Sequence, residues 1–154
     1  MSSSSDLVNQ AKVAYQEVPA APRRHTAVVT CFDARVDPWR ILEAGPGDVQ
    51  VFRNAGGIVT EDVIRSLVIS NHKFGVTGVN LIMHTDCGMI GLDQSAVEAE
   101  LGRLPFDLGG FDDLTTELRR GGERLRSEPL LHLSGGVATY IYDLRDGGLR
   151  RQSA

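Results

Sequence analysis

The stretch Thr26-Ala-Val-Val-Thr-Cys-Phe-Asp-Ala-Arg35 joins a short apolar run to a thiol, a carboxylate and a guanidinium. Its first five residues are apolar or β-branched, which is typical of a buried central strand. A second stretch of the same kind follows, in which the apolar segment 78–83 runs into His84-Thr-Asp-Cys87. In open α/β sheets, ligands bind beyond the carboxyl ends of the strands. We therefore expect both stretches to meet at one edge of a parallel sheet.

The rest of the chain alternates strands and helices in the manner of an α/β fold. The predicted strands are 26–30, 49–52, 78–83 and 137–143, and the predicted helices are 6–17, 38–43, 61–74, 94–101 and 112–126. Strand–helix–strand units at this spacing predict a parallel sheet with right-handed crossovers. The turn Asp146-Gly-Gly148 would fold the last residues back as a hairpin. In helix 112–126, the pair Gly121-Gly122 is expected to weaken the helix.

The N-terminal helix stands outside this repeating pattern. Residues 1–22 are interpreted as a serine-rich tail and a helical arm, within one domain that covers residues 1–154. The helix has an apolar stripe that must be buried, and either the sheet or a partner subunit could receive it.

The bulk composition describes an ordinary globular chain. Its 154 residues are enough for one domain with a real core, and 42% are hydrophobic and 23% charged. The net charge of −4 and pI near 5.5 give no reason to expect nucleic acid or an anionic membrane as partner. No apolar run approaches the roughly 20 residues of a membrane span, and the start lacks the features of a secretory signal. We therefore expect a cytoplasmic protein.

The only two cysteines, Cys31 and Cys87, favour a metal site. A disulfide is the weaker interpretation in a reducing compartment, and two unrelated buried cysteines would be the simplest one. Neither explains why both thiols stand at strand ends within three residues of an acidic or imidazole group. Thiolate and imidazole are zinc ligands, and a catalytic zinc site has three protein ligands with one open position. Cys31, His84 and Cys87 supply three ligands.

The neighbours Asp33 and Arg35 suggest how such a site could work. Two thiolates cancel the charge of zinc, so bound water should be less acidic than in a site with three histidines. A carboxylate that accepts a hydrogen bond from the water would orient it. Asp33 could instead turn and take the fourth zinc position, unless Arg35 holds it in a bidentate salt bridge. The alternative is an ordinary surface ion pair, which is common and weak.

The glycine-rich segment Arg53-Asn-Ala-Gly-Gly57 follows the second predicted strand. It matches neither a dinucleotide fingerprint nor a Walker loop. We expect Gly56 and Gly57 to let the backbone approach the metal site and to offer amides to an oxygen atom on the substrate side. A tight turn without further function is the alternative.

Four other polar residues carry weaker signals. Asp86 could orient a metal ligand from behind or simply form the turn. His25, His72 and His132 lack metal-like spacing and are expected to be solvated or capping residues.

Taken together, these motifs resemble the β-class carbonic anhydrases, in particular their short bacterial and archaeal members. The resemblance runs from about Val28 to Leu92 and is loose beyond residue 93. It implies zinc on Cys31, His84 and Cys87. It also implies Asp33 and Arg35 as the catalytic pair, with Asp33 as a possible fourth zinc ligand in a closed, inactive form.

The activity implied by this resemblance is the reversible hydration of carbon dioxide to bicarbonate and a proton by zinc-bound hydroxide. The resemblance also implies a homodimer, or a tetramer, in which the N-terminal helix reaches over the partner. Some family members hydrolyse carbon disulfide or carbonyl sulfide on the same kind of zinc site, which is the first alternative. A zinc-stabilised domain without activity, closed permanently by Asp33, is the second.

Overall fold

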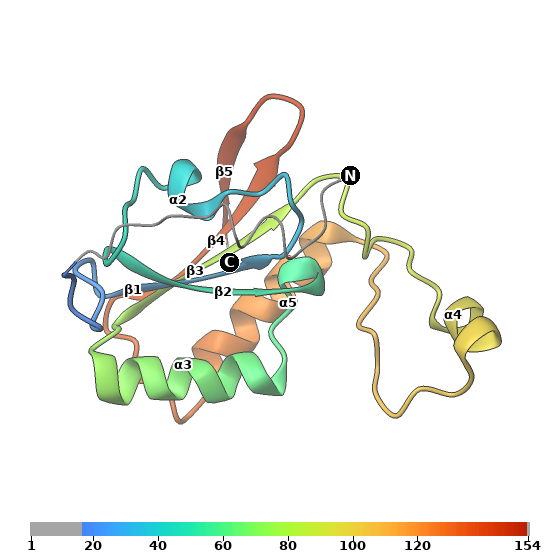
Figure 1. The fold of residues 1–154 in the computed structure, drawn as a ribbon, viewed down its shortest axis with the longest axis horizontal. Coiled ribbons are helices and arrows are strands. Elements are labelled where there is room, and N and C mark those ends of the chain that lie inside the picture. Colours follow the sequence, from blue (N-terminus) through green and yellow to red (C-terminus); the bar gives the residue numbers. More distant parts are fainter. Residues whose placement is uncertain (1–16, 154) are drawn as a thin grey trace, which may run out of the picture.

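The computed structural model describes residues 17–153, and a five-stranded sheet forms its centre (Figure 1). The strands are β1 (Thr26–Cys31), β2 (Val49–Asn54), β3 (Gly78–His84), β4 (Gly136–Asp143) and β5 (Gly148–Gln152). Their order is β2-β1-β3-β4-β5. The first four are parallel, and β5 pairs antiparallel with β4. The mainly parallel sheet and the terminal hairpin predicted from the sequence are thus confirmed. The predicted N-terminal helix, and its contact with a partner, lie outside the described residues.

Each of the four α-helices in the described part of the chain begins after a residue whose side chain accepts a backbone amide of the first turn. They are α2 (Pro38–Ile41), α3 (Glu61–Phe74), α4 (Gln94–Leu101) and α5 (Leu114–Ser127), with a short 3₁₀ turn η1 (Ala55–Gly57). Thr60 caps α3 by accepting the Val63 amide, and Gly75 ends it in the left-handed conformation. Helix α2 ends two residues earlier than predicted, and Glu43 already has a φ of 47°. Helix α5 is capped by Asp113 and begins slightly later than predicted.

Helices α3 and α5 cover one face of the sheet, where the larger core lies (Figure 1). The two glycines of α5 explain how close this packing is. A Cβ on Gly121 would lie 2.8 Å from Leu81 Cδ2, and a Cβ on Gly122 would lie 2.8 Å from Thr139 Cγ2. The two glycines, which were expected to weaken the helix, therefore allow α5 to pack closely on the sheet. Larger residues at these positions would push the helix away from β3 and β4. A smaller core around Val28 and Ile82 lies on the opposite face.

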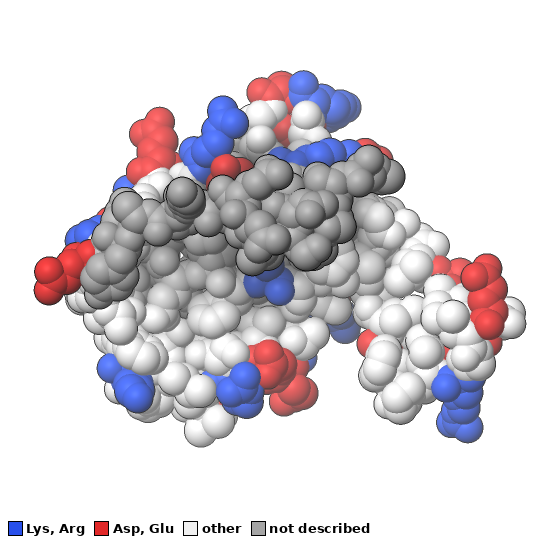
Figure 2. Space-filling model, viewed as in Figure 1, with Lys and Arg blue, Asp and Glu red and all other residues white. Residues whose placement is uncertain are grey.

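Helix α4 projects away from the sheet together with the loop that follows it (Figure 1). Within the described chain, α4 has no buried residue. The Gln94 side chain ties the projecting segment together, since it accepts the Leu108 amide and donates to Glu98. Figure 2 shows acidic and basic side chains interspersed on the face drawn, including this projection. Among residues 17–153, no helix combines the length and the apolar character needed to cross a membrane.

The register of the strands brings the two reactive stretches together. β1 and β3 are parallel neighbours, with Thr30 opposite Ile82, so both chains leave the sheet at the same edge. On the other side of β1, Cys31 is opposite Asn54, which places η1 beside the cysteine. We call this side, where Cys31 and His84 end their strands, the carboxyl edge.

Candidate metal centre

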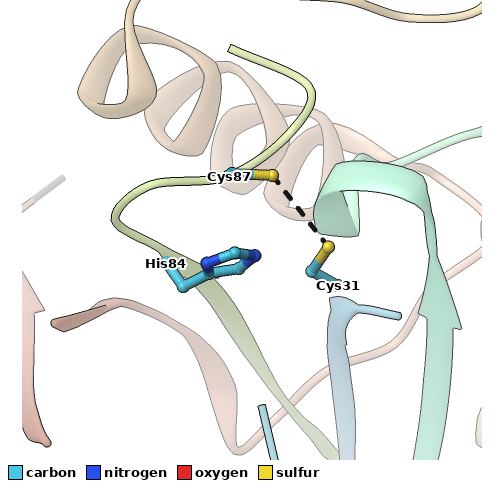
Figure 3. Close-up of side chains that lie close together, drawn as sticks. All are labelled: Cys31, His84 and Cys87. Atoms are coloured by element: carbon cyan, nitrogen blue, oxygen red, sulfur yellow. Dashed lines mark hydrogen bonds between the residues drawn. The ribbon is translucent and has the colours of Figure 1, made fainter. Parts of the chain in front are cut away.

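Cys31, His84 and Cys87 meet at the carboxyl edge (Figure 3). The possible ligand atoms of the three residues lie within 4.8 Å of one another, and all three side chains are buried. Cys31 Sγ and Cys87 Sγ are 4.0 Å apart, which is far beyond a disulfide bond. Cys31 ends β1, His84 ends β3, and Cys87 lies in the turn that follows. The sequence prediction that these three side chains converge agrees with this geometry.

The donor set fits a zinc ion. At a zinc–sulfur distance of about 2.3 Å, tetrahedral coordination separates two sulfur atoms by about 3.8 Å, close to the separation observed here. His84 Nδ1 is 2.8 Å from the carbonyl oxygen of Thr85, which can only accept a hydrogen bond. Nδ1 therefore carries the hydrogen of the neutral ring, and Nε2 keeps a lone pair. This Nε2 is buried and has no hydrogen-bond partner among the described residues, which is the state expected of a metal ligand.

The two sulfur atoms have different surroundings. Cys31 Sγ accepts the Gly56 amide at 3.3 Å and the Asp33 amide at 3.4 Å, two contacts that suit a thiolate. Burial raises the pKa of the Cys87 thiol to about 11, although a backbone hydrogen bond from Met89 opposes the rise. At neutral pH a metal ion that binds here must displace the Cys87 proton.

Arg35 joins the two loops of the site. Its guanidinium holds both oxygens of the Asp33 carboxylate and also reaches across to Asp86, whose carboxylate lies 2.8 Å away and whose carbonyl lies 3.0 Å away. Asp86 itself has a φ of 54° and a side chain that is 81% exposed. Of the two interpretations of Asp86, the turn is therefore what the structure shows. Its carboxylate contacts Arg35 and no ligand side chain.

Asp33 faces the metal cluster from the side. Its Oδ2 lies 3.8 Å from His84 Nε2. The hydrogen bonds from the Arg35 side chain hold the pKa of Asp33 well below its ordinary value, so the group is a carboxylate and an acceptor at neutral pH. The cluster of possible metal ligands among the described residues consists of Cys31, His84 and Cys87, without Asp33.

Gly56 and Gly57 lie close to the loop that carries Cys31, and the amide of Gly56 contacts its sulfur atom. Gly57 has a φ of 67°, and a Cβ there would lie 2.9 Å from the backbone nitrogen of Cys31. The Gly56 amide donates to Cys31 Sγ. That the amides of Gly56 and Gly57 also serve an oxygen atom on the substrate side stays a prediction.

Arg53 has a role that the sequence did not reveal. Its guanidinium donates to the carbonyl oxygens of Cys31, Asp33 and Val36, at 3.0, 2.8 and 2.9 Å. It thereby fixes the backbone of the loop that carries Cys31, Asp33 and Arg35. The only signal in the sequence is a basic residue near the end of β2, and that signal is too general to assign such a role.

The remaining histidines and the larger cavities lie elsewhere. His25 Nδ1 lies 3.1 Å from the carbonyl oxygen of Gly75, and His72 Nε2 lies 2.9 Å from that of Leu130. A cavity of about 550 Å³ lies beside β4 and β5, and one of about 440 Å³ lies between β2 and α3. The three possible ligand side chains are buried, and these two larger cavities are lined by other residues.

Comparisons with known proteins agree with this geometry. The sequence model of the carbonic anhydrase family matches residues 26–117. The chain is 34% identical to β-carbonic anhydrase 1 of Mycobacterium tuberculosis, over 86% of this chain and 84% of that protein. It is 31% identical to a carbon disulfide hydrolase of Saccharolobus solfataricus, over 83% of this chain and 77% of the relative. The solved structure of a carbonic anhydrase from Streptococcus mutans superposes with a TM-score of 0.83 at 31% identity, covering 97% of this chain and 92% of the other.

Proposed function

This chain belongs to the β-class carbonic anhydrases, and we propose from that premise that it hydrates carbon dioxide reversibly to bicarbonate and a proton, with zinc held by Cys31, His84 and Cys87. The observation that carries the proposal is the buried imidazole nitrogen of His84, which faces two thiols and has no other partner within the described chain. The other residues of the site then have roles that follow from their contacts.

When bound, zinc would act as a Lewis acid that lowers the pKa of a water molecule and so supplies hydroxide. The protein groups around it orient that water and the substrate. Asp33 is ionised and lies beside the cluster, so it would accept a hydrogen bond from the attacking oxygen species and orient that oxygen toward the carbon atom of carbon dioxide. Overall, one water molecule adds to carbon dioxide: its oxygen bonds to the carbon, one carbon–oxygen π bond opens and leaves its electron pair on oxygen, and the released proton goes to buffer.

Arg35 keeps Asp33 in this orientation. Both carboxylate oxygens of Asp33 are engaged by the Arg35 guanidinium, which favours an acceptor role over a turn of the carboxylate toward the metal. This pairing also weighs against a zinc-stabilised domain without activity, because such a domain would need Asp33 as a permanent fourth ligand.

Hydrolysis of carbon disulfide is the second candidate, since several relatives of this chain are carbon disulfide hydrolases. Carbon disulfide is linear like carbon dioxide, and two water molecules convert it to carbon dioxide and two molecules of hydrogen sulfide. Identity to the carbonic anhydrase relative is higher, at 34% against 31%. Carbonyl sulfide would react in the same manner.

We also propose that the protein is a cytoplasmic homodimer and that residues 1–154 of each chain form a single domain. Strand β2 is an edge strand, and the cavity between it and α3 is lined by apolar side chains that include Phe52, Ile69 and Phe74. A second copy that covers this edge would bury these groups and protect the strand. The two free thiols suit a reducing compartment. We further propose that residues 1–22 form an arm that reaches over the partner. Two such dimers could pair into a tetramer.

Stopped-flow hydration of carbon dioxide tests the activity, with hydrogen sulfide release from carbon disulfide as the comparison on the same zinc-loaded preparation. We expect carbon dioxide to be turned over faster than carbon disulfide throughout the range from about pH 6 to 9. Faster release of sulfide would select the second candidate. Absence of both reactions in zinc-loaded protein would leave a zinc-binding domain without this activity.

A further inference from the structure

A single residue, Thr85, connects His84 to the neighbouring strand. The carbonyl oxygen of Thr85 lies 2.8 Å from His84 Nδ1 and accepts its hydrogen. The amide of Thr85 donates to the carbonyl oxygen of Tyr142 at 3.1 Å, which continues the pairing of β3 with β4. The position of the carbonyl that determines the His84 tautomer therefore depends on how Thr85 is held.

The hydroxyl of Thr85 is held as well. Its Oγ1 lies 3.3 Å from Asp143 Oδ1 and accepts the Leu144 amide at 3.0 Å. Hydrogen bonds from the Arg145 side chain keep the pKa of Asp143 below its ordinary value, so Asp143 is a carboxylate that can only accept. The single hydroxyl hydrogen of Thr85 is therefore donated to Asp143. The carbonyl, amide and hydroxyl of Thr85 all have partners, and Thr85 has little freedom to rotate.

Asp143 is a firm anchor for this contact. It is only 6% exposed, although it carries a charge. Its two oxygens accept Arg145 Nε at 3.0 Å and Nη2 at 2.7 Å, and Oδ1 also accepts the Arg145 amide at 3.0 Å. Arg150 from β5 approaches Oδ2 to 3.5 Å. A charged, buried carboxylate at the end of β4 is thus tied to the terminal hairpin and to Thr85 at once.

We propose that Asp143 is a positioning residue for the metal site and acts on His84 through Thr85. Asp143 fixes the Thr85 carbonyl, the carbonyl keeps the hydrogen of the imidazole on Nδ1, and Nε2 is left with its lone pair toward the two sulfur atoms. Groups that orient a metal-binding histidine in this manner typically change metal affinity 10- to 100-fold when they are removed. The inference rests on the zinc site proposed above.

Zinc affinity, measured on the full-length chain by competition with a chelator, tests the inference without reference to activity. Asp143→Ala should weaken zinc binding about 10- to 100-fold. Asp146→Ala is the matched control, because Asp146 lies on the same hairpin and pairs with Arg150 without contacting Thr85. The control should bind zinc within about twofold of the parent chain, since it leaves the His84 tautomer untouched. Equal affinity of the parent, Asp143→Ala and Asp146→Ala chains would overturn the inference.

A second pair of variants covers the case in which Asp143→Ala fails to fold. Thr85→Val removes the hydroxyl at nearly constant volume and should weaken zinc binding as Asp143→Ala does, whereas Thr85→Ser keeps the hydroxyl and should restore the affinity. Nitrogen-15 NMR of the metal-free chain reports the tautomer directly. The parent and Thr85→Ser should show His84 with its hydrogen on Nδ1, and Thr85→Val should show a mixture of tautomers.

The outcomes separate this inference from the proposed function. A parent chain that binds no zinc would overturn both. A parent chain that binds zinc and hydrates carbon dioxide, together with a Thr85→Val chain of unchanged affinity and tautomer, would overturn the role of Asp143 alone.

Discussion

Arg35 engages both oxygens of the Asp33 carboxylate, with Nε 3.0 Å from Oδ1 and Nη2 2.8 Å from Oδ2. This bidentate pair decides which way Asp33 faces. Asp33→Ala should therefore lower turnover of carbon dioxide by about 100-fold, because the attacking water loses its orientation. The zinc content should stay at the parent level, since Asp33 lies outside the cluster of three ligands. Metal analysis and stopped-flow kinetics of one preparation check both parts, and loss of zinc would show that Asp33 is itself a ligand.

Arg35→Lys should also reduce turnover, because an ammonium group cannot bind a carboxylate at two points. Asp86→Ala provides the comparison on the other side of the same guanidinium. The Asp86 side chain is 81% exposed, and exposed ion pairs contribute at most about 1 kcal/mol, so its removal should cost no more than about fivefold. A larger loss in Asp86→Ala than in Arg35→Lys would contradict this ranking of the two contacts.

Arg53→Met should destabilise the protein, because three carbonyl groups of the loop that carries Cys31 lose their donor. We expect the free energy of unfolding to fall by about 1 to 2 kcal/mol in denaturant titrations. Arg65→Met is a suitable control, since Arg65 pairs with Asp62 on the exposed surface of α3 and should change stability by less than about 1 kcal/mol. Equal effects of the two changes would mean that Arg53 does not hold the loop.

Gly57→Ala should be more harmful than Gly91→Ala. Both glycines have a positive φ, 67° and 71°, so each alanine pays a similar backbone strain. At Gly57 the new Cβ would also lie 2.9 Å from the backbone of Cys31, whereas nothing lies within 4 Å at Gly91. Thermal unfolding of the zinc-loaded variants should show the larger loss for Gly57→Ala, together with weaker zinc binding. Similar losses at both positions would indicate that strain alone matters.

The buried carboxylate of Asp143 predicts a particular response to acid. Its pKa lies below the ordinary value of 3.8 because of Arg145, so the unfolded chain takes up the proton first as the pH falls. The stability that Asp143 contributes is complete above the ordinary value and is lost as the pH drops through the lowered one. Below about pH 4, the free energy of unfolding should therefore fall less steeply with decreasing pH in Asp143→Asn than in the parent chain. The difference in slope should correspond to at most one proton taken up on unfolding. Parallel curves for the parent and Asp143→Asn would contradict the assignment.

The sequence predicted the strands and α-helices found within residues 17–153, because these depend on local patterns, and it predicted the cluster of three possible ligands. Strand ends at Cys31 and His84 can be recognised from apolar runs, and parallel pairing then brings them to one edge. The contacts of Arg53 and of Thr85 with Asp143 could not be predicted in this way. They join residues far apart in the chain, and each depends on the exact register of neighbouring strands and on the direction of one side chain.

Glycines gave incomplete signals for the same reason. Gly121 and Gly122 indicate a poor helix when only propensity is considered, and their close contact with the sheet appears only once α5 lies on β3 and β4. Likewise, the sequence suggested that Gly56 approaches the metal site, but the sulfur acceptor of its amide depends on the three-dimensional arrangement.

The most direct test is a zinc titration of the metal-free chain followed by carbon dioxide hydration. If Cys31, His84 and Cys87 hold the catalytic ion, activity should rise in proportion to added zinc and stop rising at one zinc per chain, and His84→Ala should abolish this rise. Hydration that is independent of zinc, or a chain that binds one zinc at these residues and remains inactive, would contradict the account.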